Sequence, residues 1–176
     1  DNYYHLFYQH NPYGDHWGWM HWGHARSKDL VHWEHLPIAL WPSIEKNERH
    51  CFSGSGFIKD DGSPVLFYTS IDQQWKPEQW LVTPVDNSLY QWEKYPANPV
   101  ISHEIHNGMK ISSWRDPFLF RDNGKTYMVN GGHTDDGKGS IMLYEALDHE
   151  LTDWKFLGVP FSGNEKNWEC PNFFKI

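Results

Sequence analysis

Cysteine is scarce in this sequence, and its scarcity excludes one class of protein. Only Cys51 and Cys170 occur among 176 residues, too few for the disulfide framework that holds many small secreted domains together. As free thiols they fit a reducing compartment. We therefore expect a cytoplasmic protein, with secretion as the alternative.

Positive charge and long apolar runs are also in short supply. The chain has 15 Lys and Arg residues against 23 Asp and Glu, a net charge of −8, so it lacks a general basic field for nucleic acid or an anionic membrane. No apolar run approaches the roughly 20 residues of a membrane span, and the N-terminus has no signal-peptide pattern. We expect neither nucleic acid nor a membrane as a partner. The sequence does not indicate the oligomeric state.

Aromatic residues, by contrast, make up 17% of the chain, with 11 tryptophans. Rings that combine an apolar face with a polar edge suit the faces of sugars as well as protein interiors. We expect most of these tryptophans in the core and a few at a small carbohydrate ligand.

A repeat of about 60 residues organises the chain. Trp33, Trp92 and Trp154 recur at that step within similar segments, and three short β-prone runs keep the same period. The similar segments are 27–34, 87–93 and 148–155, and the β-prone runs are 5–8, 65–68 and 126–129. Two landmarks that share one period indicate repeated structural units.

Each unit is predicted to contain four strands, because turn signals such as Asn123-Gly124 separate the β-prone runs and helical periodicity is hard to find. A four-stranded unit repeated radially predicts an all-β chain of propeller blades, and a β-sandwich with coincidental similarity between strands is the alternative. We place the repeats at roughly 1–50, 51–112 and 113–166, with the next starting at 167. The first lacks its innermost strand. Three blades do not close a ring, so we expect the chain to be part of a larger propeller.

Two strands of one pattern each deliver an acid. Segment 114–120 sets Arg115 and Asp116 in an apolar, aromatic run, and segment 168–174 repeats the pattern around Glu169. Leading strands of a propeller line its central channel, so these charges, with Ser53 and Ser55, would face a ligand. Gly54 and Gly56 would let a ligand or a neighbouring strand approach the backbone closely.

Paired carboxylates among aromatics, without a metal signature, predict glycoside hydrolysis. A carboxyl crowded by Trp168 and Phe173 would have its charged form disfavoured, which favours Glu169 as the proton donor. Asp116, beside Arg115, would keep its charge and stabilise positive charge on the sugar ring. Both roles are hypotheses at this stage.

The histidines offer a competing site. His21 and His24 could suggest a metal pair, but segment 19–26 is more naturally a strand, in which positions three apart face opposite ways. We therefore expect no metal and no cofactor.

Several motifs resemble glycoside hydrolase family 32, the β-fructofuranosidases, which include invertases, sucrose-6-phosphate hydrolases, inulinases and levanases. The resemblance runs in order along essentially the whole chain. The motifs occupy residues 4–12, 22–25, 27–33, 52–55, 115–117 and 169–171.

The resemblance implies a five-bladed propeller, usually followed by a C-terminal β-sandwich that we expect to be absent here. It also implies retaining hydrolysis of terminal β-fructofuranosides, with sucrose or sucrose 6-phosphate as the expected substrate and longer fructans left open. Glu169 would be the acid/base, Asp116 the transition-state stabiliser and Arg115 a positioning residue. The residues implied to line the fructose pocket are Gln9, Trp17, Phe52 and Ser53.

One departure from the family concerns the nucleophile, an Asp in a Trp-Met-Asn-Asp-Pro-Asn-Gly-like motif just ahead of the strand at Tyr4. This chain lacks that motif, and a retaining enzyme without its nucleophile cannot form the covalent intermediate. We expect the 176-residue chain alone to be inactive while its parent protein is active. Alternatives are a fructosyltransferase on the same scaffold and a non-catalytic carbohydrate-binding propeller.

Overall fold

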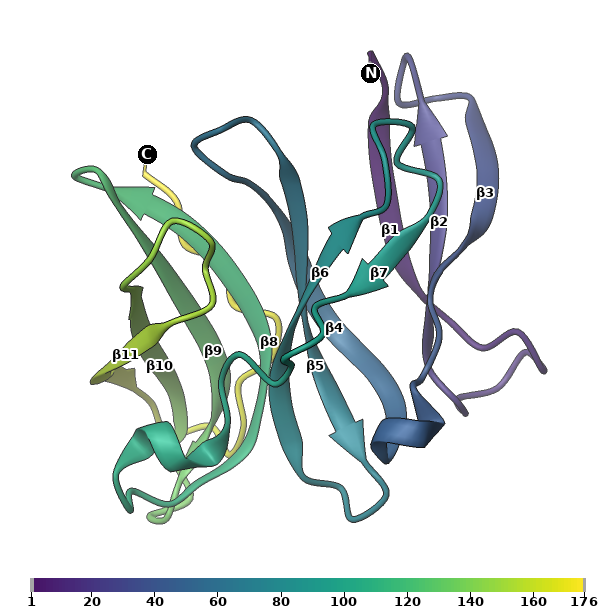
Figure 1. The fold of residues 1–176 in the computed structure, drawn as a ribbon. Coiled ribbons are helices and arrows are strands. Elements are labelled where there is room, and N and C mark those ends of the chain that lie inside the picture. Colours follow the sequence, from purple (N-terminus) through teal and green to yellow (C-terminus); the bar gives the residue numbers. More distant parts are fainter. Residues whose placement is uncertain (1, 176) are drawn as a thin grey trace.

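In the computed structural model, which describes residues 2–175, the strands form three antiparallel sheets (Figure 1). Each sheet is a meander in which strands pair in chain order. The first contains β1 (Tyr4–His10), β2 (His21–Ser27) and β3 (Trp33–Leu40). The second contains β4 (Glu48–Ile58), β5 (Pro64–Asp72), β6 (Pro77–Pro84) and β7 (Trp92–Lys94). The third contains β8 (Ile111–Asp122), β9 (Lys125–Thr134), β10 (Gly139–Ala146) and β11 (Trp154–Ser162).

Local turn chemistry explains the tightest hairpin. Asp122 pairs with Lys125 across Asn123-Gly124, and both turn residues have positive φ, 49° and 76°. Asn and Gly tolerate that conformation and match the twist of the flanking strands. The predicted Asn-Gly turn is therefore confirmed. Outside the strands, the described residues form only two 3₁₀ turns, η1 (Ile44–Lys46) and η2 (His103–His106), and no helix long and apolar enough to cross a membrane.

The repeated tryptophans occupy equivalent positions in the three sheets. Each begins the last strand of its sheet, and its indole N–H donates a hydrogen bond to the carbonyl oxygen three residues earlier, where a leucine has left-handed φ. The pairs are Trp33–Leu30 at 3.2 Å, Trp92–Leu89 at 3.0 Å and Trp154–Leu151 at 2.9 Å. The sequence repeat therefore corresponds to a repeated structural unit.

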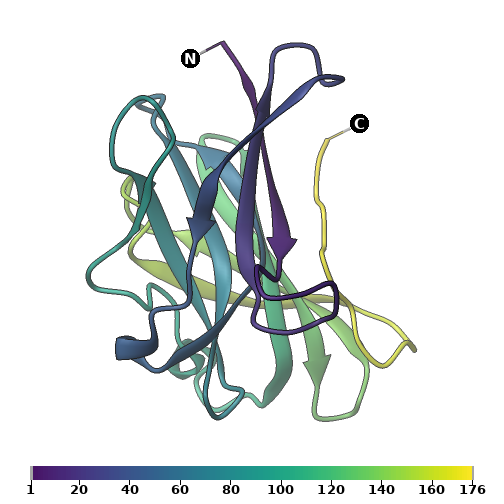
Figure 2. The same cartoon turned by 90° about the vertical axis from the view of Figure 1, so that its right-hand side faces the viewer.

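The sheets pack side by side through two apolar cores. One core joins the second and third sheets around Phe67, Trp114 and Met128, and the other joins the first and second around Trp22 and Tyr68. β4 packs against β8, and the sheets fan out from this contact (Figures 1 and 2). This succession of neighbouring meanders, of three, four and four strands, confirms propeller blades and overturns the β-sandwich alternative.

The ends of the blades differ in part from expectation. The first sheet has three strands and leaves β1 at its edge, as predicted, whereas the leading strand expected near Phe52 begins earlier, at Glu48. Among the described residues no strand forms from 167 onward. That segment lies along β9 through single contacts, such as the Trp168 N–H to the Gly132 oxygen at 3.4 Å, and has no ladder partner.

Candidate active site

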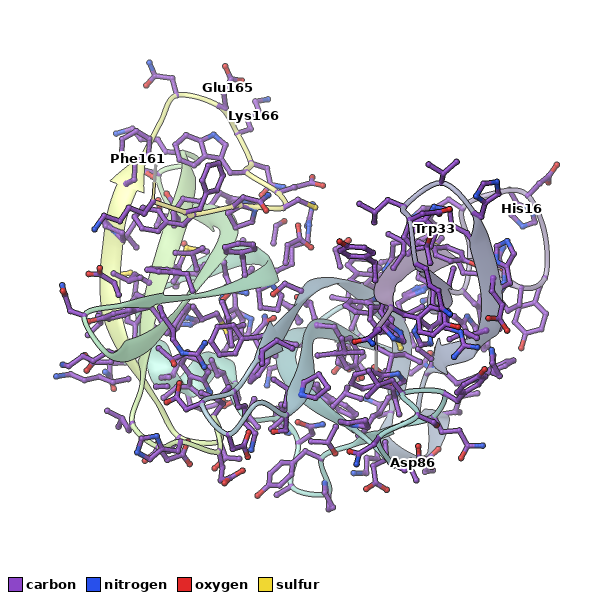
Figure 3. The ribbon with its side chains drawn as sticks, turned by 90° about the horizontal axis from the view of Figure 1, so that it is seen from above. His16, Trp33, Asp86, Phe161, Glu165 and Lys166 are labelled. Carbon is purple, nitrogen blue, oxygen red and sulfur yellow. The ribbon has the colours of Figure 1, made fainter. Side chains whose placement is uncertain are left out.

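All seven residues predicted for the site line one cavity of about 720 Å³. Gln9 lies at the end of β1 and Trp17 in the loop that follows. Phe52 and Ser53 come from β4, Arg115 and Asp116 from β8, and Glu169 from the segment 163–175. Figure 3 shows His16, which also lines the cavity, at the right-hand end of the molecule and Glu165 and Lys166 at the upper left. Elements from all three sheets therefore converge on this cavity.

A larger cavity of about 890 Å³ lies along the free edge of β1, between it and β4. It contains neither Asp116 nor Glu169, although Gln9 and Ser53 line both cavities. We assign the chemistry to the smaller cavity because ionisable groups converge there.

A bulge in β8 turns Asp116 toward the cavity. The register with β9 shifts between Arg115 and Phe118, and Asp116 has φ of 62°, an uncommon conformation that Asp tolerates better than most residues. Its N–H donates to Thr69 Oγ1 at 2.9 Å, and the Thr69 hydroxyl donates to Gln79 Oε1 at 2.8 Å. Thr69 and Gln79 are fully buried. This relay of two buried side chains, hydrogen-bonded in series, holds the positive-φ backbone of Asp116 in place.

The Asp116 carboxylate is buried, with 5% of the residue exposed. Oδ2 accepts the Cys170 N–H at 2.8 Å and lies 3.9 Å from Arg115 Nε. Burial raises the pKa of Asp116, and the Cys170 N–H and the Arg115 charge only partly oppose it. Arg115 does favour the charged form of Asp116, as expected, but desolvation outweighs it, so the pKa of Asp116 is raised overall.

Glu169 lies in wetter surroundings than predicted. Its side chain is 58% exposed, and Oε1 accepts hydrogen bonds from Arg115 Nη2 at 2.6 Å and Asn167 Nδ2 at 3.1 Å.

The two rings predicted to crowd Glu169 each pack on another ring and leave its side chain 58% exposed. Trp168 contacts Phe161, with 5.4 Å between ring centroids, and Phe173 contacts Phe120 at 4.6 Å. Arg115 nevertheless joins the two acids, because its guanidinium contacts both carboxylates.

The remaining predicted residues form the walls. Gln9 Nε2 donates to the Cys51 carbonyl oxygen at 3.0 Å, which ties the end of β1 to β4. Gly54 is needed there, because a side chain would overlap the Phe67 carbonyl, whereas Gly56 faces only ordinary contacts. The close approach to a neighbouring strand predicted for both glycines is thus confirmed for Gly54 alone.

Sequence reasoning missed several groups. Asn11, Asp15 and His16 also line the cavity, from a loop whose polar and glycine residues were the available signal. Thr69 and Gln79 left no signal, because their importance depends on strand register.

The histidines considered as a metal pair have separate partners. His21 Nδ1 bonds the Trp19 carbonyl oxygen at 2.7 Å, whereas His24 Nε2 lies 2.9 Å from His5 Nδ1. Burial lowers the pKa of His24 to about 4, which favours the neutral ring. No cluster of three or more His, Cys, Asp or Glu side chains suited to a metal ion occurs within residues 2–175.

Known proteins with similar sequences share the whole length of this chain. Residues 1–176 match the family described as glycosyl hydrolases family 32 N-terminal domain. A β-fructofuranosidase, insoluble isoenzyme CWINV3, from Arabidopsis thaliana is 38% identical over 98% of the chain, which covers 30% of that protein. Sucrose-6-phosphate hydrolase from Escherichia coli is 36% identical, with coverage of 98% and 36%.

Solved structures agree. Fructan 1-exohydrolase IIa from Cichorium intybus superimposes with a TM-score of 0.85 at 35% identity, over 97% of this chain and 32% of that one. The Bombyx mori β-fructofuranosidase BmSUC1 gives 0.83 at 34% identity, with 99% and 37% covered. The chain thus spans about a third of the length of these relatives. With the family match over its full length, it belongs to glycosyl hydrolase family 32, within the N-terminal domain.

Proposed function

We propose that the protein containing this chain hydrolyses terminal non-reducing β-D-fructofuranosides, with sucrose or sucrose 6-phosphate as substrate. The observation that carries the proposal is the convergence of Asp116, Arg115 and Glu169 in one cavity with aromatic walls. Relatives named β-fructofuranosidase and sucrose-6-phosphate hydrolase support it, as does the Bombyx mori structure in complex with sucrose.

The proposed reaction is a retaining double displacement. A carboxylate attacks the anomeric carbon of the fructosyl unit while Glu169 protonates the glycosidic oxygen of the departing sugar. Glu169 then removes a proton from a water molecule as the water oxygen attacks the anomeric carbon, and the bond from that carbon to the enzyme carboxylate breaks, which releases fructose and restores the carboxylate. Its exposed position suits a group that exchanges protons with solvent. Asp116 would hold fructose hydroxyls from its fixed, buried position.

We propose that the nucleophile comes from a strand preceding Tyr4. β1 has a free edge, and the larger cavity along it offers space for one more strand. A strand joined to the Tyr4 end of β1 by a tight turn would run antiparallel and begin near Gln9, which also lines the acid-bearing cavity. A carboxylate early in that strand would reach the two acids.

The test compares two carboxylates of the same cavity in the full-length protein. Glu169→Gln should lower kcat for sucrose about 10²- to 10⁴-fold, because proton transfer to the leaving oxygen is lost. Asp15→Asn should leave kcat within about threefold, because Asp15 is fully exposed and has no proposed role. Equal loss in both variants, or none in Glu169→Gln, contradicts the assignment.

Two further measurements bear on the alternatives. Analysis of the products formed from concentrated sucrose separates hydrolysis from fructosyl transfer. The 176-residue chain alone is expected to show no sucrose turnover. Measured turnover would contradict the proposal that the nucleophile comes from a strand preceding Tyr4.

The cytoplasmic location stays a prediction. Its support is that Cys51 and Cys170 are free thiols, but similar proteins include a cell-wall isozyme of Pisum sativum.

A further inference from the structure

Two tryptophans at the edge of the acid-bearing cavity expose about half of their surface. Trp17 is 61% exposed and lines the cavity, and Trp75, in the turn between β5 and β6, is 50% exposed. Their rings stack with 6.2 Å between centroids and 14° between planes. Neither indole is part of the two apolar cores, so packing does not account for the pair.

The turn that carries Trp75 is firmly built. Asp72 Oδ1 accepts the N–H groups of Gln74 and Lys76, each at 2.8 Å. The turn is also tied to Asn47, whose side chain donates to Gln74 Oε1 at 3.0 Å. Trp75 itself has φ of 65°, a conformation unfavourable for a bulky residue. The fold therefore fixes the indole against the local preference of the backbone.

Behind the pair lies a neutral, buried ring. His50 is 5.3 Å from both Trp17 and Trp75 between centroids. Its Nδ1 accepts the Met20 N–H at 3.3 Å, and burial lowers its pKa, so the imidazole is uncharged.

A positive group, Arg49, borders the same surface. The Arg49 guanidinium lies 4.9 Å from the centre of the Trp75 ring, and no carboxylate of the described residues forms an ion pair with it. Apolar ring surface beside hydrogen-bond donors is the combination that a sugar ring requires, with its C–H faces on the rings and its hydroxyls on the donors.

We propose that Trp17, Trp75 and Arg49 form the subsite for the second sugar of the substrate, the hexopyranose that leaves when the fructosyl bond breaks. This inference rests on the proposed function, which places the fructosyl unit beside Asp116 and Glu169. Trp17 connects the two positions, because it lines the cavity and stacks on Trp75.

The experiment compares two substrates that differ only in the leaving group, sucrose and methyl β-D-fructofuranoside, in the full-length protein. Trp75→Ala should raise KM for sucrose about fivefold, and Trp75→Phe should recover most of the loss. The kcat/KM for the methyl glycoside should change by less than about twofold, because its methanol leaving group does not reach the subsite. Trp41→Ala is the matched control, since Trp41 is 52% exposed and does not line the cavity.

An equal loss on both substrates would assign Trp75 a structural role and overturn the subsite, and so would no loss on sucrose. If the wild-type protein hydrolyses neither substrate, the proposed function fails. The binding of sucrose, followed by tryptophan fluorescence, then tests the subsite separately. A sucrose-dependent change in tryptophan fluorescence that survives Trp41→Ala and disappears in Trp75→Ala supports it. The same response in both variants contradicts it.

Discussion

Asp116 and Glu169 arise from one sequence pattern but occupy opposite environments. Each follows a tryptophan and precedes a proline, and each contacts Arg115. Asp116 lies in β8, which pairs with β9 and packs against β4, and 5% of its surface is exposed. The Glu169 side chain is 58% exposed, on a segment that has no ladder partner among residues 2–175. A shared motif therefore brings an acid to the cavity, and the surrounding strands decide how that acid behaves.

The difference suits different tasks. Asp116 is fixed by the Cys170 N–H, which its carboxylate accepts, and by the buried Thr69 hydroxyl, which accepts its own N–H, so it can hold a ligand without reorganising. Glu169 is held through one carboxylate oxygen by two partly exposed side chains. Of these two contacts only the one with Arg115 is an ion pair, and ion pairs at a protein surface contribute only about 0–1 kcal/mol. Glu169 can therefore move and exchange protons at little energetic cost.

The largest expected effect comes from removing the fixed charge. Asp116→Asn should lower kcat/KM for sucrose about 10³-fold, because a preorganised charge aimed at the reacting sugar is lost. The free energy of unfolding should not fall, because Asn can still accept the Cys170 N–H and no buried charge remains. Steady-state kinetics and urea unfolding of the full-length protein test both statements.

In contrast, Asp116→Ala should lose both activity and stability, since the Cys170 N–H is then left without its acceptor. If Asp116→Asn kept more than about a tenth of wild-type activity, the fixed acid would not be the stabiliser, and the comparison would lose its functional meaning.

A smaller effect is expected from the relay beneath Asp116. The Thr69 hydroxyl accepts from the Asp116 N–H and donates to Gln79 Oε1. Thr69→Val leaves both groups buried and unpaired, which should cost about 1–3 kcal/mol of unfolding free energy and reduce kcat about tenfold. Thr69→Ser keeps the hydroxyl and should restore kcat. A serine variant as impaired as the valine one would attribute the effect to packing.

The repeat predicted the sheets, because each sheet is built from residues close in sequence. The cavity residues come from all three sheets, and the family motifs, not a local pattern, indicated them. The environments of the two acids could not be predicted in the same way. Asp116 is held by Thr69 and Cys170, which lie 47 and 54 positions away, and their placement depends on a bulge in β8. Trp75 gave no signal either, since its contact with Trp17 exists only once the hairpin meets the first sheet.

The pH dependence of stability should show the burial of Asp116. Its pKa is raised above the ordinary 3.8. At pH values between 3.8 and the raised pKa, the folded state keeps a proton that the unfolded state releases. This group therefore makes the free energy of unfolding fall as the pH rises through that window. Relative to wild type, Asp116→Asn should therefore gain in unfolding free energy from pH 3.8 upward and level off above the raised pKa. Each pKa unit corresponds to about 1.36 kcal/mol. Urea unfolding at a series of pH values measures the difference, and a difference that shrinks with rising pH would contradict it.

The smallest effect should appear at Cys170, whose thiol reports the charge beside it. Burial raises the pKa of Cys170, the Asp116 charge raises it further, and Glu169 contributes least. Because the thiolate is the reactive form, Asp116→Asn should speed alkylation of Cys170 by iodoacetamide at pH 8 a few-fold, roughly two- to fivefold. Glu169→Gln should speed it less. Mass mapping of the Cys170 peptide gives the rate, and Cys170→Ser removes the signal. If both variants accelerated the reaction equally, the Cys170 thiol would respond to the two carboxylates alike. The contrast between the buried Asp116 and the exposed Glu169 would then not extend to their effect on this neighbouring group.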